Sequence, residues 1–216
     1  MRDPAHFWDK IAKRYAAKPI SDVDAYKRKL ELTRERLRPD MSVLEIGCGT
    51  GSTAIKLSPD VSEIDAVDIS SAMLTIAAER ATESNVGNVR FLQSSVEDFT
   101  IAEGHYDVIL AHSILHLVTD LEARITDVKR WLKPGGVFVS NTACIAEVNP
   151  VVRGILPLGN LLGLTPPLNA FTRSSLENAI ENVGFQIEYA WPLKHGVFLI
   201  AKNALAENRP EAAKII

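Results

Sequence analysis

The sequence predicts an α/β fold, with a doubly wound, mainly parallel sheet of seven strands whose last strand is reversed. From residue 42 onward, short runs rich in Val, Ile and Phe alternate with segments of helical periodicity. This order is typical of βαβ units with right-handed crossovers. The last two strand-like runs are too close together for such a crossover. The first of the runs leads directly into a glycine-rich turn, as in α/β folds whose sites lie at the carboxyl ends of strands.

Five candidate strands open the alternating region. They are short, apolar and separated by helical or turn-forming residues: Ser42–Ile46, Ser62–Asp68, Val89–Gln93, Tyr106–Ala111 and Gly136–Thr142. Because a βαβ connection returns the chain in the same direction, we expect these five strands to be parallel.

Helical patterns lie between the candidate strands. Helices are expected over Thr53–Leu57 and Ser71–Arg80, after the first and second strands. An apolar stripe at positions i, i+4, i+7 and i+11 predicts a further helix over residues 121–132. Thr119 and Glu122 have the spacing of a capping box at its start.

The end of the chain departs from the alternating order. A helix over Ser174–Val183 is followed by two strand-like runs, Phe185–Trp191 and Gly196–Lys202, which only four residues separate. A parallel partner needs a crossover of about a dozen residues or more. These two strands are therefore expected to be antiparallel or not adjacent, which gives the sheet one reversed strand.

The whole chain, residues 1–216, is expected to form one domain. Its predicted parts are a helical N-terminal cap, a core, an apolar insertion, a closing helix with two strands, and a tail: residues 1–38, 39–143, 144–172, 173–202 and 203–216. In the insertion, Asn149 and Pro150 have the pattern of an N-cap and a first helical residue, followed by an apolar stripe. That stripe predicts a lid over the site, and a packed hairpin or a homodimer contact is the alternative.

Composition excludes several classes. Hydrophobic residues make up 46% of the chain and the net charge is −3, which favours a globular protein without a general nucleic-acid footprint. Cys48 and Cys144 lack partners at metal-ligand spacing. Residues 151–171 are too interrupted by prolines and polar residues to span a membrane. The N-terminus lacks the apolar core of a signal peptide, so we expect a cytoplasmic protein.

The strongest local signal is the run VLEIGCGTG, in which Gly47, Gly49 and Gly51 follow a strand and precede a helix. Such glycines let the backbone approach a ligand closely. The dinucleotide fingerprint requires a glycine where this chain has Ser52. Glu45, two residues before the turn, would oppose a pyrophosphate but suits a ligand that carries an ammonium group.

Asp68 ends the second candidate strand, 21 positions after Gly47. A carboxylate at this place accepts both hydroxyls of a ribose in dinucleotide-binding folds. The ligand indicated therefore has a ribose and a cationic end but no phosphate to be held, and S-adenosylmethionine fits this description. The alternative is that Glu45 and Asp68 are simply solvated residues at strand ends.

Five motifs resemble those of class I S-adenosylmethionine-dependent methyltransferases, particularly the small-molecule branch that includes quinone-biosynthesis enzymes. In order, they are VLEIGCGTG, IDAVDIS, FLQSSVEDF, YDVILAHSILHLV and LKPGGVFVSNT. The resemblance covers residues 39–143 and, more loosely, 172–202. It implies the Rossmann-like methyltransferase fold, S-adenosyl-L-methionine as cofactor and a small-molecule methyl acceptor.

The resemblance also implies roles for individual residues. The methionine part of the cofactor would lie along Gly47, Gly49, Gly51, Ala111 and His112, with Glu45 near its amino group. The adenosine part would contact Asp68 at the ribose and Ile69, Ser95 and Val96 at the adenine. Ser95 stands where the family usually has a carboxylate. Tyr15 resembles an aromatic residue that covers the cofactor, although a core-facing tyrosine on an amphipathic helix is equally consistent.

Methyl transfer needs a general base only if the acceptor must lose a proton. His112, His116, His195 and Tyr15 are the candidates, and His116 is the first choice because it follows the fourth strand at its carboxyl end. The alternative for His116 is a packing role in the loop. His112 is interpreted as a cofactor contact.

Missing motifs narrow the chemistry. After the fourth strand the chain has neither the Asn/Asp-Pro-Pro-aromatic signature of amino methylation nor the acidic cluster of a magnesium-dependent catechol methyltransferase. We therefore expect metal-free, in-line transfer to a small, apolar or aromatic molecule. Two alternatives stay open: an NAD(P)-linked oxidoreductase, and a methyltransferase-like domain that binds cofactor but only regulates a partner.

Overall fold

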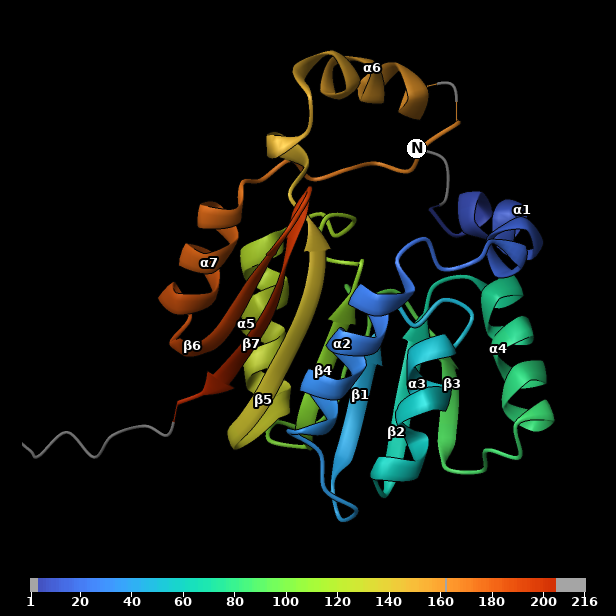
Figure 1. Ribbon diagram of the computed structural model, residues 1–216, viewed down its shortest axis with the longest axis vertical. Helices are drawn as coiled ribbons and strands as arrows, with labels where there is room; N and C mark the ends of the chain where they lie inside the picture. The colour runs from blue at the N-terminus through green and yellow to red at the C-terminus, as the bar shows by residue number, and fades with distance from the viewer. Residues whose placement is uncertain (1–3, 162, 205–216) are drawn as a thin grey trace, which may run out of the picture.

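A computed structural model describes residues 4–161 and 163–204 of the chain. Seven strands form a single sheet in the order β3-β2-β1-β4-β5-β7-β6 (Figure 1). Their bounds are β1 Ser42–Ile46, β2 Glu63–Asp68, β3 Val89–Gln93, β4 Tyr106–His112, β5 Leu132–Ala143, β6 Phe185–Leu193 and β7 Gly196–Asn203. Strands β1 to β5 are parallel, and β7 is antiparallel to both β5 and β6. The predicted sheet with its reversed last strand is confirmed.

The described residues form seven α-helices: α1 Pro4–Ala17, α2 Val23–Arg34, α3 Ser52–Leu57, α4 Ser71–Glu83, α5 Leu121–Trp131, α6 Pro150–Leu161 and α7 Arg173–Asn182. Helices α5 and α7 cover one face and α2 and α3 the other, while α1 and α6 lie beyond the carboxyl ends of the parallel strands (Figure 1). No helix in the described part of the chain is long and apolar enough to cross a membrane. Most of the predicted tail, residues 205–216, lies outside the described residues.

Burial on both faces of the sheet explains why Val43, Leu44 and Ile46 of β1 are all apolar. Leu44 and Ile46 belong to the hydrophobic cluster beneath α5 and α7. Val43 points the other way, into the cluster with residues of α2, α3 and α4. Because both of its faces are packed, β1 has a fixed position between β2 and β4. The turn that follows β1 therefore begins at a fixed point between these two strands.

The predicted capping box was wrong. Asp120 is the N-cap of α5, and its carboxylate accepts a hydrogen bond of 3.0 Å from the backbone N–H of Ala123. Thr119 instead donates from its backbone and hydroxyl to the Glu97 carboxylate, at 3.3 and 3.4 Å. A charged carboxylate is the stronger partner for the free N–H groups of a helix start, so the helix begins one residue later than the box implied.

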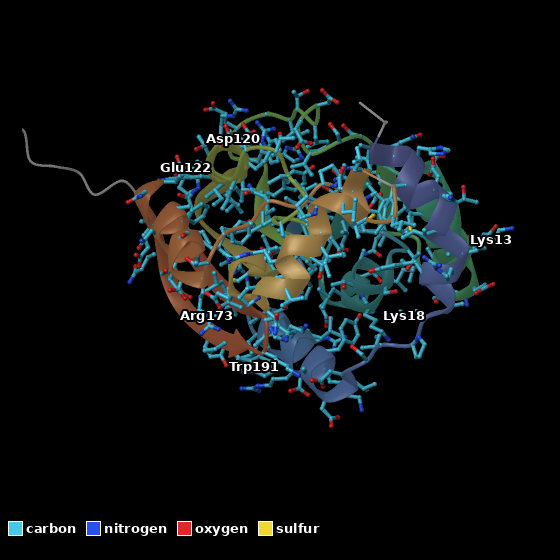
Figure 2. All side chains as sticks on the ribbon, turned by 90° about the horizontal axis from the view of Figure 1, so that it is seen from above. Lys13, Lys18, Asp120, Glu122, Arg173 and Trp191 are labelled. Atoms are coloured by element: carbon cyan, nitrogen blue, oxygen red, sulfur yellow. The ribbon has the colours of Figure 1, made fainter. Side chains whose placement is uncertain are left out.

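The insertion contains a helix where the sequence placed one. α6 begins at Pro150, and the side chain of Asn149 accepts a hydrogen bond of 2.9 Å from the backbone N–H of Val151. Seen from above, α6 crosses the middle of the face at the carboxyl ends of the strands, with α1 on one side and α7 on the other (Figure 2). Its apolar stripe is not packed on the core, since Val151 is 71% exposed and Leu161 is 75% exposed.

Candidate functional site

The glycine turn between β1 and α3 depends on left-handed backbone conformations. Gly47, Gly49 and Gly51 have φ angles of 68°, 53° and 72°. A Cβ atom on Gly47 would lie 2.8 Å from Ile114, and one on Gly51 would lie 2.9 Å from Ala77. A Cβ on Gly49 would meet nothing within 4 Å. Gly47 and Gly51 therefore allow close packing, whereas Gly49 presents bare backbone to open space where a ligand fits.

Asp68, at the end of β2, holds this turn. Its carboxylate accepts hydrogen bonds from the backbone N–H groups of Gly49, at 2.8 Å, and Ser70, at 2.9 Å. Burial raises the pKa of Asp68, and these two hydrogen bonds counteract the rise. The carboxylate still borders a cavity, so it has room to accept hydroxyl groups from a ligand.

Two cavities meet at the glycine turn. One, which we call the Asp68 cavity, has a volume of about 430 Å³ and also contains Ile69 in its lining. The other, the Lys29 cavity, has a volume of about 710 Å³ and contains Glu45 and Lys29. Both are lined by Tyr15, Gly47, Gly49, His112 and Ser113. A ligand that lies across the turn therefore reaches both.

The Asp68 cavity brings together most of the residues predicted for the adenosine part of a cofactor. Asp68, Ile69, Ser95 and Val96 all line it. The Ser95 hydroxyl donates to the Asp98 carboxylate at 2.7 Å and accepts from the Asp98 backbone N–H at 3.0 Å. Its hydrogen-bonding capacity is therefore already used within the loop, which leaves less for an adenine amine.

Glu45 is the buried acid of the Lys29 cavity. It is 2% exposed, and its Oε2 atom has no hydrogen-bond partner among the described residues. Burial, together with the nearby charge of Asp68, raises the pKa of Glu45 to about 8, and the backbone N–H of Ala54 opposes the rise. An unpaired buried carboxyl is costly, and a ligand ammonium would supply the missing partner.

His112, at the end of β4, borders both cavities. Its Nε2 atom is buried without a hydrogen-bond partner in the described part of the chain. Burial and the nearby charge of Lys29 lower the pKa of His112 to about 4, so the ring is neutral at pH 7. A neutral ring in this place suits a hydrogen bond to a ligand better than the storage of a proton.

The structure does not bring all predicted residues to the cavities. Gly51, Ala111 and His116 are absent from both linings. The His116 ring lies with Nδ1 3.2 Å from the Thr142 hydroxyl, and its backbone oxygen accepts from Asn169 at 2.8 Å. Burial lowers the pKa of His116. The role of His116 as a base stays a prediction.

Helix α1 is fixed beside the glycine turn by contacts that sequence reasoning missed. The Asp9 carboxylate accepts from the Ser70 hydroxyl at 2.6 Å and from the Ala72 backbone at 3.1 Å, at the start of α4. Trp8 and Tyr15 pack edge to face, 6.3 Å apart. Burial, with the charges of Asp68 and Glu45, raises the pKa of Tyr15. Tyr15 lines both cavities and is 48% exposed, and its role as a covering residue stays a prediction.

The fold and this site define the class I S-adenosylmethionine-dependent methyltransferases. Residues 37–162 match a family model described as a methyltransferase domain, and the chain belongs to this family. Its cofactor is S-adenosylmethionine, and the unpaired Glu45 oxygen, the Asp68 carboxylate and the space at Gly49 fit that molecule. None of these findings favours an NAD(P)-linked oxidoreductase.

Individual methyltransferases are also similar in sequence to this chain. The methyltransferase YcgJ of Bacillus subtilis (strain 168) is 35% identical over 102 residues, 47% of this chain and 40% of the relative. The ubiquinone/menaquinone biosynthesis C-methyltransferase UbiE of Shewanella halifaxensis (strain HAW-EB4) is 36% identical over 103 residues, 46% of this chain and 41% of the relative. The chain therefore spans about two fifths of the length of these relatives.

Solved structures agree on the fold. The crystal structure of YcgJ from Bacillus subtilis has a TM-score of 0.65 and 27% identity, and the match covers 77% of this chain and 73% of YcgJ. A geranyl diphosphate C-methyltransferase from Streptomyces coelicolor A3(2) has a TM-score of 0.68 and 17% identity, with 82% and 77% of the two chains covered. That structure contains S-adenosyl-L-homocysteine.

The raised pKa of Glu45 predicts a pH dependence of cofactor binding. If the ligand ammonium pairs with Glu45, the carboxyl must lose its proton on binding. Below the Glu45 pKa of about 8, affinity for S-adenosylhomocysteine is then expected to increase by up to about tenfold for each unit by which the pH is raised. Calorimetry at pH 7 in buffers of different ionisation enthalpy measures the released proton. Glu45→Gln should abolish the release, and an equal release in both proteins would contradict the pairing.

Proposed function

We propose that this protein transfers the methyl group of S-adenosylmethionine to a small, apolar or aromatic acceptor by in-line displacement without a metal ion. The observation that supports this most is the meeting of the two cavities at the glycine turn. With adenosine in the Asp68 cavity, the sulfonium group of the cofactor would lie at the shared residues, which include His112 and Ser113. The acceptor would approach through the part of the Asp68 cavity that adenosine leaves free.

In the transfer, an electron pair of the acceptor forms a bond to the methyl carbon as the bond from carbon to sulfur breaks. Those bonding electrons stay on sulfur, which gives S-adenosylhomocysteine. The cofactor supplies the leaving group, so the protein contributes alignment and exclusion of water. Asp68 would hold the ribose, Glu45 the ammonium, and Ile69 the adenine, while Tyr15 covers the site.

The lining of the Asp68 cavity supports an apolar acceptor. Trp8, Ile114, Leu117, Pro166 and Pro167 contribute to it from α1, from the loop after β4 and from the insertion. Two similar proteins are a C-methyltransferase of ubiquinone/menaquinone biosynthesis and a geranyl diphosphate C-methyltransferase. Both similarities support a small-molecule acceptor for this protein.

The test is transfer of label from methyl-labelled S-adenosylmethionine to fractions of a small-molecule extract in the presence of EDTA. We expect labelled product in an organic-soluble fraction. Labelling only of protein or nucleic acid would contradict the acceptor class. Strict dependence on added magnesium would contradict the metal-free displacement.

His116→Ala tests the predicted base once an acceptor that loses a proton is known. If His116 is the base, turnover should fall by about 10²–10⁴-fold while S-adenosylhomocysteine binding is unchanged. His6→Ala is the matched control, because His6 is exposed on α1 and lines neither cavity. Equal turnover in the two variants would contradict the role of His116 as a base and would favour a packing role beside Thr142.

We propose that residues 144–172 act as a lid on the acceptor side. Pro166 and Pro167 already border the Asp68 cavity, while the apolar side chains of α6 stay exposed, with Ile155 at 59%. Closure over an apolar acceptor would bury such surface. Hydrogen exchange across 144–172 should slow when S-adenosylhomocysteine and acceptor are both bound. Equal protection in the empty protein, or protection that depends only on protein concentration, would contradict the lid.

A further inference from the structure

One side of α6 is apolar and exposed to solvent. Side chains spaced three or four residues apart share one side of a helix. Those of α6 that follow this spacing are all more than half exposed: Val151, Ile155, Leu158 and Leu161. Leu164, just beyond the helix, is more than half exposed as well. A continuous exposed apolar surface of this kind is typical of a contact with another protein or with a membrane.

The polar groups of this segment favour a membrane over a protein partner. Residues 148–172 contain no Asp or Glu, and Arg153 is their one charged residue. Arg153 already donates to the Ala146 backbone oxygen at 2.9 Å, which leaves Asn160 as the other polar side chain of α6. Contacts between proteins use about one hydrogen bond per 100–200 Å². An apolar helix face that enters lipid needs no such bonds.

Helix α1 carries positive charge on the same face of the molecule. Lys10, Lys13 and Arg14 have the spacing i, i+3 and i+4, so they share one side of α1, opposite the buried Ala12. All three are exposed, and none forms an ion pair within residues 4–161 and 163–204. Asp9, the single acid of α1, is held by hydrogen bonds at the start of α4. The exposed side of α1 is therefore free to meet anions.

The positive and negative charges lie on opposite sides of α6. Seen from above, Lys13 on α1 is at one edge of the face that α6 crosses, and Asp120 and Glu122 are at the opposite edge (Figure 2). An extended anionic surface would thus meet α6 and α1 together, on the side away from these two acids.

We propose that α6 and α1 bind the surface of a lipid bilayer that contains anionic lipids. The apolar side chains of α6 would enter the boundary between headgroups and acyl chains. Lys10, Lys13 and Arg14 would lie at the anionic headgroups. The protein would lie on the bilayer, and no segment of it would need to cross.

This position would connect the bilayer with the acceptor site. Pro166 and Pro167 of the insertion line the Asp68 cavity together with Trp8 of α1. An apolar acceptor would therefore pass from lipid into the cavity without crossing water. Closure of residues 144–172 would follow, with the acceptor in place of lipid against α6. This route rests on the proposed function, whereas the bilayer contact itself does not.

The experiment measures sedimentation of the full chain, without cofactor or acceptor, with vesicles of phosphatidylcholine alone or with about 30% phosphatidylglycerol. Binding to the anionic vesicles should be at least about tenfold tighter and should weaken in high salt. Lys10→Gln with Lys13→Gln should weaken it by about 10–30-fold, since each cation near the surface contributes about fivefold. Arg38→Gln with Lys202→Gln is the matched control, because both residues are exposed near the amino ends of the parallel strands.

Ile155→Gln with Leu158→Gln tests the apolar part of the contact. Binding to the anionic vesicles should fall by about 10–100-fold, because two apolar side chains no longer enter the lipid. Val23→Gln is the control, because Val23 is 49% exposed but lies on α2. Since the replaced side chains are exposed, the urea midpoint of every variant should be unchanged, which separates a failure to bind from a failure to fold.

Absence of binding to anionic vesicles would overturn the inference, as would equal losses in the variants and their controls. Full binding by Ile155→Gln with Leu158→Gln would indicate electrostatic adsorption alone and contradict the role of α6. A dimer that this variant abolishes, without vesicle binding by the wild type, would make a second copy of the chain the partner instead. Because the assay contains neither cofactor nor acceptor, these failures are distinguishable from failure of the proposed methyl transfer.

Discussion

Asp68→Ala is expected to weaken S-adenosylhomocysteine binding by about 10²–10⁴-fold, because two hydrogen bonds from ribose hydroxyls to a charged carboxylate are lost. The variant also removes the acceptor for the Gly49 and Ser70 backbone N–H groups, which loosens the turn that the cofactor crosses. Equilibrium binding by calorimetry measures the effect.

Asp68→Asn serves as the comparison for this variant. Its amide oxygen can still accept one backbone hydrogen bond, but the charge is gone. Binding should therefore fall between that of the wild type and that of Asp68→Ala. A well-folded Asp68→Ala protein with wild-type affinity would show that the ribose is held elsewhere.

Gly51→Ala is expected to lower the free energy of unfolding by about 2–5 kcal/mol. Alanine at a φ of 72° is strained, and its Cβ would lie 2.9 Å from the Ala77 Cβ and 3.0 Å from the Phe91 ring. The strain costs about 1–2 kcal/mol and the overpacking about 1–3 kcal/mol. Urea unfolding with an unchanged m-value would measure the loss.

Gly87→Ala is the control for this substitution. Gly87 is exposed, its φ is not positive, and a Cβ there would meet nothing within 4 Å. Its stability should stay within about 0.5 kcal/mol of the wild type. If Gly51→Ala and Gly87→Ala were equally stable, the close packing described for the glycine turn would be wrong.

Local patterns made most of the fold predictable. The bounds of β1 and β3 were predicted without error, because short apolar runs between turn residues define both strands. β5 begins at Leu132, four residues earlier than predicted, since Leu132 pairs with Tyr106 across an irregular register. Lys133, Pro134 and Gly135 carry no strand pattern, so only the pairing with β4 could reveal this extension.

The site was predictable where its residues follow strands. Glu45, Gly49 and Asp68 stand at fixed distances from the ends of β1 and β2, so spacing alone brings them together. Asp9 lies 61 positions from Ser70, and Arg80 lies 64 positions from Ala16. No local pattern links such residues, because only the path of α1 across the turn makes them neighbours.

The solvent exposure of individual side chains could not be predicted from the sequence either. The apolar stripe of α6 is visible as a pattern, yet a pattern does not say which face meets the core. In the structure Val151, Ile155 and Leu158 are all more than half exposed. Lys29 shows the converse: it sits in a charged stretch typical of a solvated helix, and tertiary packing makes it half-buried.

A crystal structure of the protein with S-adenosylhomocysteine would show directly how the cofactor lies across the glycine turn. We expect both ribose hydroxyls within hydrogen-bond distance of the Asp68 carboxylate, the amino group against Glu45, and the sulfur beside the residues shared by the two cavities. A complex in which the ribose contacts neither oxygen of Asp68, or in which the ligand lies outside both cavities, would contradict it.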